Sequence, residues 1–177
     1  EMNIRQTLRA SYNALLGISL TVSQDSKVLN FEKVSHKIIA VNPTIDDLEL
    51  LPNGIIEYVY PLEGNESVLG YDILEDSLRH LEAIKALEGQ NVYFAGPFEL
   101  KQGGLAIIGR LALFIEGKFW GFSAVLIRVE SFYDAVGFES LEKKGYDIVL
   151  RKVDPITKRQ EVYFGESQDV SSVFSAE

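Results

Sequence analysis

The sequence predicts an α+β domain in which a long N-terminal helix precedes an antiparallel sheet. Apolar residues repeat at helical spacing over the first 40 residues, and the period then changes to that of strands. A single further stretch of helical spacing longer than two turns interrupts the strands. Helices that lie apart from antiparallel strands define this class. The 177 residues suit one domain or two small packed modules.

Two helices are predicted within the first 43 residues. The first, over 2–24, has apolar residues every three or four positions: Ile4, Leu8, Leu15, Ile18 and Val22. The second begins after Asn30, a residue type that favours helix N-caps. It ends at Asn42-Pro43, because the residue before a proline avoids the helical conformation.

The middle of the chain alternates between strands and one helix. Strands are expected at 48–51 and 55–60, on either side of a turn at Pro52-Asn53-Gly54. Residues 72–87 return to helical spacing, with Asp72 at the N-cap position and Gly89 at the C-cap.

The second half is predicted to be mostly β structure. A broken strand, two long strands joined by a turn at Glu116-Gly117, a short helix and a final hairpin follow in order. Their expected ranges are 92–94 with 98–100, 105–115, 118–129, 130–136, 145–153 and 160–165.

Composition excludes several classes of function. The chain has 26 acidic and 17 basic residues, and its net charge of −9 repels phosphate backbones and anionic lipid headgroups. It has no cysteine, which rules out disulfides, zinc-thiolate sites and cysteine nucleophiles. No run of 18 apolar residues is present. We expect no nucleic-acid partner, and membrane attachment only through flanking segments absent from this chain.

Catalytic motifs are missing from the sequence. Gly121-Phe122-Ser123 lacks the second glycine of a nucleophile elbow, and no phosphate-binding glycine motif occurs. The neighbouring carboxylates Asp46 and Asp47 diverge on a strand, so they do not form an acid/base pair. Neither histidine has a second ligand at metal spacing. We therefore expect no enzyme activity, no cofactor and no metal.

Several segments between residues 42 and 132 resemble, in the same order, the CHASE family of extracellular sensory domains of histidine kinases and nucleotide cyclases. The segments are Leu50-Leu51-Pro52-Asn53-Gly54, Leu69-Gly70-Tyr71-Asp72, Ala95-Gly96-Pro97-Phe98-Glu99-Leu100, Gln102-Gly103-Gly104, Gly109-Arg110-Leu111 and Trp120-Gly121-Phe122. One departure is Ala112, where the family usually has proline.

The resemblance implies a long helix followed by PAS-like modules, with a ligand held in the membrane-distal one. It divides the chain into a helical stalk at 1–43, a distal PAS-like ligand-binding module at 44–133 and a proximal PAS-like module at 134–177, which we expect to be truncated. It further implies a periplasmic or extracellular domain of an inner-membrane or cell-membrane receptor that senses a small molecule and signals to a cytoplasmic output domain.

Two charged residues are the main candidates for ligand contacts. Asp72 matches the position at which plant members hold the ring nitrogens of cytokinin, but it equally suits a helix N-cap. Arg110 stands where the plant pattern has threonine and interrupts an apolar strand, on the same face as Ile108. In a pocket it would clamp a ligand carboxylate; on the outer face it would be a solvated charge. This difference favours a small acid or zwitterion over a purine.

Aromatic strand residues complete the candidate site. Strand aromatics usually pack in a core, but at least one should line a pocket if a pocket exists. The full candidate set is Asp72, Tyr93, Phe94, Ile108, Arg110 and Trp120. Arg79 is expected to pair with Glu75 on the helix surface.

Two other functions remain open. The apolar stripe of the first helix suits pairing with a second copy, so the chain is expected to form a homodimer through Leu8 and Leu15. Such a dimer fits both a sensor and a ligand-free interaction module of a membrane receptor. A hydrolase would need a Ser-His-Asp cluster assembled by the fold, which no sequence motif indicates.

Overall fold

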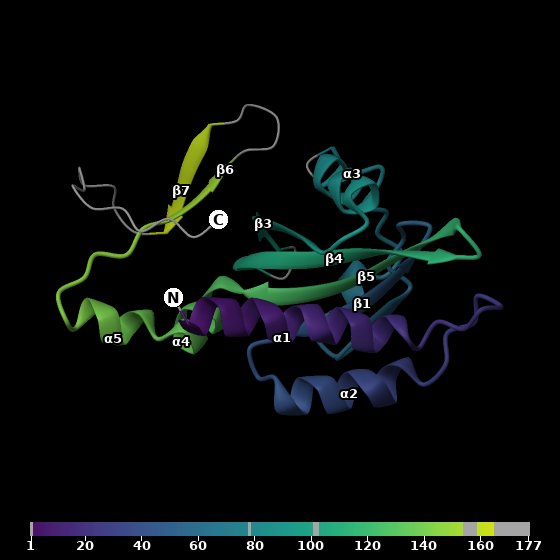
Figure 1. The fold of residues 1–177 in the computed structure, drawn as a ribbon, viewed down its shortest axis with the longest axis horizontal. Helices are drawn as coiled ribbons and strands as arrows, with labels where there is room; N and C mark the ends of the chain where they lie inside the picture. Colours follow the sequence, from purple (N-terminus) through teal and green to yellow (C-terminus); the bar gives the residue numbers. More distant parts are fainter. Residues whose placement is uncertain (1, 78, 101–102, 154–158, 165–177) are drawn as a thin grey trace.

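The computed structural model describes residues 2–77, 79–100, 103–153 and 159–164 (Figure 1). The N-terminal half contains α1 (Met2–Ser19), α2 (Phe31–Val41), β1 (Asp47–Pro52), β2 (Tyr58–Tyr60), the 3-10 helix η1 (Glu66–Val68) and α3 (His80–Gly89). The C-terminal half contains β3 (Tyr93–Glu99), β4 (Leu105–Ile115), β5 (Lys118–Arg128), α4 (Val129–Val136), α5 (Phe138–Glu142), β6 (Leu150–Val153) and β7 (Gln160–Phe164). The predicted α+β class is confirmed.

Five strands form one antiparallel sheet in the order β2-β1-β5-β4-β3. Helices α1 and α2 lie on one side of this sheet, and α3 lies on the other (Figure 1). Strand β1 pairs with β5, although about 70 residues separate them in the sequence. Strands β6 and β7 form a separate hairpin.

The two sides of the sheet bury different clusters, which we call the α1 face and the α3 face. The α1 face includes Ala14, Leu15, Ile18, Phe31, Ile45, Leu48, Leu50, Trp120, Val125, Ile127, Phe132, Val136 and Phe138. The α3 face includes Leu51, Ile56, Ile73, Ala83, Ala86, Leu100, Ala106, Ile108, Ala112, Phe122, Ala124 and Leu126. Alternate residues of β1, of β4 and of β5 from Phe122 onward therefore point to opposite clusters, as the pleat requires. Trp120 departs from this alternation, next to the irregularity between Leu113 and Phe114 of β4.

Helix α1 directs its predicted apolar stripe into the domain. Leu15 and Ile18 are fully buried on the α1 face, so the stripe packs against the sheet. The helix ends at Ser19 rather than at residue 24, because the hydroxyl of Thr21 donates a 2.6 Å hydrogen bond to the Ile18 carbonyl and turns the chain. Val22 then pairs with Val28 in an isolated antiparallel bridge.

The helix predicted over 72–87 begins eight residues late, at His80. Asp72 forms an isolated bridge with Ile55, and its Oδ1 accepts the N–H of Leu74 at 2.8 Å. Asp76 Oδ1 accepts the N–H of Arg79 at 2.7 Å. These side chains give the backbone turns that compete with a helix, so Asp72 is not the helix N-cap that the sequence predicted.

The broken strand predicted at 92–94 and 98–100 is one strand, β3, with an irregularity between Ala95 and Phe98. Gly96 lies there with φ 109°, and a Cβ on it would be 2.8 Å from the Ala106 carbonyl oxygen. The backbone of β3 therefore approaches β4 too closely for any side chain at this position.

The sheet joins α4 through a clasp at Asp46. Its Oδ2 accepts the N–H of Arg128 at 2.6 Å, and its Oδ1 accepts the hydroxyl of Ser131 at 3.2 Å. This carboxylate thus ties the start of β1 to the end of β5 and the start of α4. The short helix α5 was not predicted, and its Phe138 packs on the α1 face.

The C-terminal hairpin is shorter than predicted, because β6 begins at Leu150 rather than at residue 145. Residues 154–158 and 165–177 lie outside the described part, so the proximal module at 134–177 stays a prediction. Across the described ranges, every helix is too short or too polar to cross a bilayer.

Candidate functional site

Four charged side chains are buried between the sheet and α3. Asp47 and Glu49 come from β1, Arg110 comes from β4, and Glu82 comes from α3. Each is at most 6% exposed. Charged groups are rarely buried to this degree unless they have partners or a function. These buried charges distinguish the α3 face from an ordinary apolar core.

The strand register sets the spacing of these groups. Glu49 pairs with Ala124, Ala124 pairs with Arg110, and Arg110 pairs with Tyr93, so the four residues form one row across β1, β5, β4 and β3. Neighbouring strands lie about 4.8 Å apart, which puts the Cα atoms of Glu49 and Arg110 roughly 10 Å apart. A methyl group, the side chain of Ala124, lies between the two charges.

Arg110 is the most buried charged group of the site, at 2% exposure. Its Nε and Nη1 atoms are buried, and within the described part of the chain neither has a hydrogen-bond acceptor. Its guanidinium carbon lies 5.9 Å from the centre of the Phe98 ring. Burial lowers the pKa of Arg110 to about 10, so it remains cationic at neutral pH. A buried donor that is left without an acceptor lowers the stability of a folded protein by roughly 1–3 kcal/mol, and by more when the group is charged.

The carboxyl groups on β1 have perturbed proton affinities. Burial raises the pKa of Glu49 to about 7, and the positive charges of Arg110 and Arg79 oppose this rise. Burial, followed by repulsion from Glu49, raises the pKa of Asp47 well above its usual value. Asp47 Oδ1 is also buried with no hydrogen-bond partner among the described residues. With its pKa at about 7, Glu49 can gain or lose its charge near neutral pH.

A second arginine lies beside the buried one. The guanidinium carbon of Arg79, the residue before α3, lies 5.2 Å from the centre of the Tyr71 ring and 5.4 Å from that of Phe98. Its Nη2 donates to the Glu99 carbonyl at 3.4 Å. The predicted surface pair with Glu75 does not hold Arg79, which instead stacks on aromatic rings near Arg110.

The structure brings together three of the six predicted ligand contacts. Tyr93, Ile108 and Arg110 all lie on the α3 face. The Tyr93 hydroxyl also accepts a 3.3 Å hydrogen bond from Lys85 Nζ on α3. Asp72 lies in the turn before α3, where its carboxylate accepts the N–H groups of Leu74 and Glu75.

Phe94 and Trp120 lie on the other side of the sheet from Arg110. Phe94 pairs with Gly109, where an added Cβ would meet both the Phe94 ring and Val125 of the α1 face. Trp120 is itself part of the α1 face. Strand alternation alone did not assign these faces, because the sequence does not show which side of each strand carries the charges.

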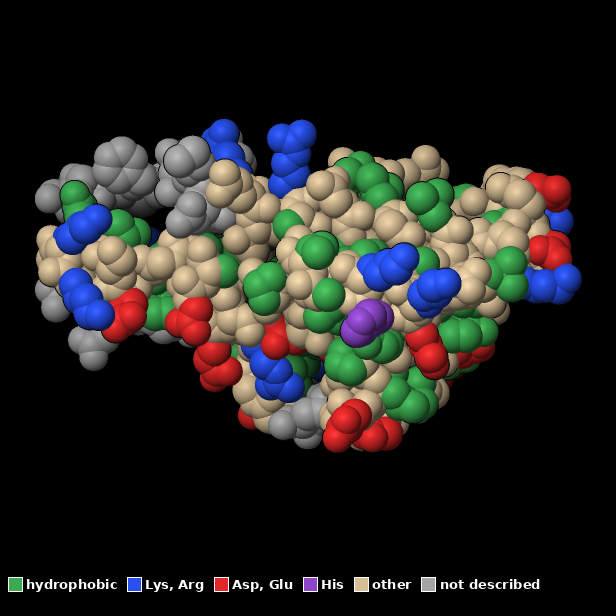
Figure 2. All heavy atoms as spheres, turned by 90° about the horizontal axis from the view of Figure 1, so that it is seen from below, with side chains coloured by type: hydrophobic (Ala, Val, Ile, Leu, Met, Phe, Trp, Pro, Cys, Tyr) green, Lys and Arg blue, Asp and Glu red, His purple; other side chains and the backbone are tan. Residues whose placement is uncertain are grey.

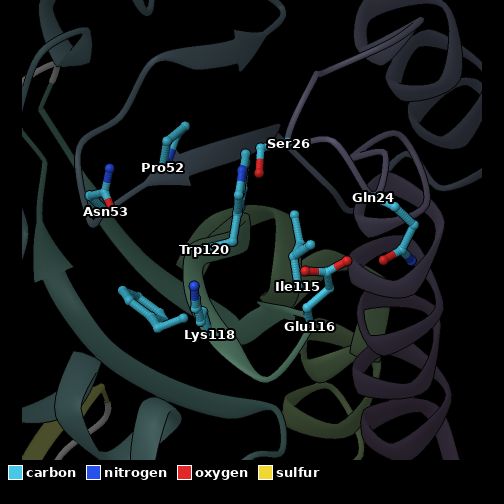
Figure 3. A pocket seen from close by; sticks show the side chains of 9 residues that line it. Gln24, Ser26, Pro52, Asn53, Ile115, Glu116, Lys118 and Trp120 are labelled. Atoms are coloured by element: carbon cyan, nitrogen blue, oxygen red, sulfur yellow. The ribbon is translucent and has the colours of Figure 1, made fainter.

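Trp120 does line a cavity, but a different one (Figure 3). This cavity of about 400 Å³ lies at the turn between β4 and β5 and is lined by Gln24, Ser26, Pro52, Asn53, Ile115, Glu116, Lys118, Phe119 and Trp120. Its charged residues, Glu116 and Lys118, are both exposed. It therefore offers a ligand only solvated charges, which give weaker recognition than the buried groups of the α3 face.

The sequence reasoning missed four members of the charged cluster: Asp47, Glu49, Glu82 and Arg79. A signal was present for two of them, because Asp47 and Glu49 alternate with leucines in a short apolar strand. For Glu82 and Arg79 the polar surroundings in the sequence gave no such signal.

The CHASE domain family matches residues 11–163 of the chain. The chain belongs to the CHASE family. This family assignment agrees with the resemblance of its ordered segments. No curated protein matches the sequence.

Solved sensory domains share the fold of this CHASE domain. The ligand-binding domain of the Pseudomonas aeruginosa PAO1 amino acid chemoreceptor PctC, in complex with GABA, matches with a TM-score of 0.62 and 16% identity, over 85% of this chain and 66% of that one. The Campylobacter jejuni chemoreceptor Tlp3 with isoleucine bound matches at 0.55 and 13%, over 76% and 57%. The E. coli DcuS sensor domain matches at 0.52 and 10%, over 77% and 98%.

These likenesses confirm the expected PAS-like architecture of the CHASE domain. The chain spans less than two thirds of the two chemoreceptor domains and nearly all of the DcuS domain. At such low identities the shared property is the fold, and the ligand has to be argued from the residues of this chain.

Proposed function

We propose that this sensory domain binds a small molecule that carries a carboxylate, and that the carboxylate contacts Arg110 on the α3 face. The observation that carries the proposal is the burial of the Arg110 guanidinium with two nitrogens that lack acceptors among the described residues. A carboxylate is the natural complement of a guanidinium, and the pair is strongest where water is excluded.

The position of Arg110 suits a sensor. It lies under α3, whose buried residues Glu82, Ala83 and Ala86 face the sheet. A ligand that enters between α3 and the sheet would separate them and change how α3 packs on β3 and β4. A receptor needs such a difference between its free and bound states, because a ligand shifts an equilibrium only through its differential affinity for two states.

In the intact receptor, this change would be relayed across the membrane to a cytoplasmic output domain. The Asp46 clasp supports a route toward the C-terminal side of the domain. Asp46 joins β1, which carries Glu49, to Arg128 and to Ser131 of α4. A displacement of β1 would therefore act directly on α4.

Thermal unfolding of the 177-residue chain with a panel of small acids and zwitterions tests the proposal. A ligand that binds only the folded state stabilises it by about 2.7 kcal/mol at roughly 100 times its Kd. We expect a rise in Tm with at least one carboxylate, a smaller rise for Arg110→Lys and none for Arg110→Ala. Arg151→Ala, which removes an exposed arginine from β6, is the matched control and should respond like the wild type.

Two results would contradict the proposed carboxylate site. One is a carboxylate that raises the Tm of the wild type and of Arg110→Ala equally, since Arg110 would then play no part. The other is a ligand response confined to molecules that have no carboxylate.

A second candidate function is association of two copies of the chain through α1. The predicted stripe with Leu15 packs inside the domain, so a different set of residues on α1 would have to form the contact. Tyr12, Leu16 and Leu20 recur every four residues on the outer side of the helix and are 38%, 39% and 86% exposed. The α2 side of the molecule shows hydrophobic side chains spread among charged ones rather than one broad apolar patch (Figure 2). A homodimer through α1 would therefore rest on this narrow stripe.

Sedimentation velocity measures this association. The double variant Leu16→Lys and Leu20→Lys should sediment as a monomer at concentrations where the wild type dimerises. Leu69→Lys, which charges a comparably exposed leucine elsewhere, should leave the dimer intact. Leu15 is unsuitable for this test, because it is fully buried against the sheet and a lysine there would destabilise the fold rather than the dimer. A wild type that stays monomeric at high concentration would refute the homodimer.

A further inference from the structure

The charges of the α3 face are not matched by Arg110 alone. Among the described residues, Arg110 is the single buried cation beside the buried carboxyl groups of Asp47, Glu49 and Glu82. The other nearby cations are less buried: Arg79 stacks on Phe98, Lys85 contacts Tyr93, and Arg128 acts on Asp47. A ligand with only a carboxylate would satisfy Arg110 but would add a further negative charge beside these groups. Like charges at short range in a buried site are unfavourable.

Glu49 is the acid best placed to meet a ligand. It shares a row with Arg110, with only the methyl group of Ala124 between them. Within the described residues, neither a hydrogen bond nor an ion pair within 4.0 Å engages Glu49, so its attraction to Arg110 acts only at longer range. Its carboxylate is therefore buried without a close partner among the described residues.

An independent observation on the same strand also indicates a missing partner. Asp47, two residues before Glu49 and on the same face, is 3% exposed, and its Oδ1 has no hydrogen-bond partner among the described residues. Buried polar atoms in folded proteins nearly always have a partner. Glu49 on β1 and the donors of Arg110 on β4 thus flank Ala124 from opposite sides, and Asp47 lies two residues along β1, opposite Leu126.

We infer that the ligand carries a cationic nitrogen as well as a carboxylate, and that it spans Ala124 with its nitrogen at Glu49 and its carboxylate at Arg110. This inference rests on the proposed function and narrows its ligand class from acids to zwitterions. An ammonium has three donors, enough to serve Glu49 and the free oxygen of Asp47 together. It also places a positive charge next to the Glu49 carboxylate, which has no close cation among the described residues.

The ionisation of Glu49 makes this nitrogen contact sensitive to pH. The charged groups that face Glu49 are Asp47 on its own strand, Arg110 on β4 and Arg79 before α3, while Glu82 of α3 acts on Arg110. Since burial raises the pKa of Glu49 to about 7, it becomes fully anionic only above neutral pH. The preference for a cationic nitrogen should therefore grow as pH rises from about 6 to 8.

Calorimetric titration of the 177-residue chain with matched triples of ligands tests the inference. One triple is leucine, 4-methylpentanoate and 3-methylbutylamine, and another is 4-aminobutyrate, butyrate and butylamine, so that each zwitterion is compared with its acid and its amine. At pH 8 we expect at least one zwitterion to bind roughly tenfold or more tightly than its acid, which is the order of one charge-assisted hydrogen bond.

The variant Glu49→Gln removes the charge and keeps the shape. It should bring the zwitterion and its acid to similar affinities, while Glu57→Gln, an exposed change just before β2, should keep the wild-type preference. Should Glu49→Gln fold poorly, the wild type at pH 6 and pH 8 gives a second measurement, in which the preference for the zwitterion should increase with pH.

The outcomes separate this inference from the function on which it rests. If acid and zwitterion bind equally tightly and both need Arg110, the zwitterion inference is wrong and the carboxylate site stands. A preference that persists in Glu49→Gln, or that does not change between pH 6 and 8, also overturns it. If binding is strongest for the amine and independent of Arg110, the carboxylate site itself is wrong.

Discussion

The two faces of the sheet are built from the same strands but differ in chemistry. The α1 face is mainly apolar, with Leu15, Leu48, Val125 and Ile127 fully buried beside the hydroxyl of Ser123, and the buried charges of the described residues all lie elsewhere. The α3 face surrounds Phe122 with alanines and adds buried charges, chief among them Arg110. Burial of apolar surface stabilises a folded protein by roughly 25 cal/mol per Å². Burial of a charge destabilises it unless a partner offsets the loss of hydration. The first face stabilises the domain, and the second contains buried donors and acceptors that have no hydrogen-bond partner among the described residues.

Strand β1 carries this difference within six residues. Leu48 and Leu50 point to the α1 face, while Asp47 and Glu49 point to the α3 face. Substitutions on the two sides of this sheet should therefore affect different properties, stability on one side and ligand binding together with pH dependence on the other.

Removal of a core side chain from the α1 face should give the largest loss of stability. Leu15→Ala is expected to lower the free energy of unfolding by about 2–5 kcal/mol, because it leaves a cavity under α1. Urea unfolding measures this, with Leu16→Ala on the exposed side of the same helix as the control. The ligand preferences of the folded fraction should not change; altered preferences would contradict the division between the faces.

The pH dependence of stability should depend on Glu49. Its pKa is about 7 in the folded domain and near 4.5 when exposed, so folding takes up a proton between these values. This contribution is fully present below pH 4.5 and is lost as pH rises to 7, by roughly 3 kcal/mol at most.

The comparison of urea unfolding for the wild type and Glu49→Gln at pH 5 and pH 8 isolates this contribution. The difference in stability between the two proteins should favour the wild type more at pH 5 than at pH 8. If the free energy of unfolding changes equally with pH in the two proteins, Glu49 does not change its ionisation on folding. Any pH dependence that both proteins share would then come from another group such as Asp47.

Replacement of the buried charges by neutral groups should raise stability modestly. Arg110→Met combined with Glu49→Gln is expected to increase the free energy of unfolding by about 1 kcal/mol or more, because it removes the desolvation of both charges. The same variant should lose its ligand response in the thermal assay. A large loss of stability instead would identify the charges as structural.

The sequence predicted regular β structure better than the segment before α3. Strand β4 and the turn at Glu116-Gly117 were predicted to the residue, because a long apolar strand and a compact turn leave few alternatives. The helix at 72–87 was misplaced because Asp72 and Asp76 form hydrogen bonds with the nearby backbone. Hydrophobic periodicity depends only on the apolar positions, so it does not report that these side chains compete with the helix for backbone hydrogen bonds.

The candidate site was predictable only in part. Arg110 was found because a charge inside an apolar strand is visible in the sequence. Glu49 was not, because its role depends on β5 bringing β1 and β4 side by side, a long-range pairing that no local pattern reports. The sequence could not show that Phe94 and Trp120 lie on the other side of the sheet from Arg110, since alternation gives relative faces only within one strand.

The insertion of β5 between β1 and β4 also fixes the order of assembly. Glu49 and Arg110 lie 61 positions apart in the chain and come into one row only when β5 has paired on both of its edges. Such contacts form late in folding, because a long loop has to close before they contribute. A nascent or truncated chain that stops before residue 118 therefore has both charges but no site, so recognition begins only once the sheet is complete.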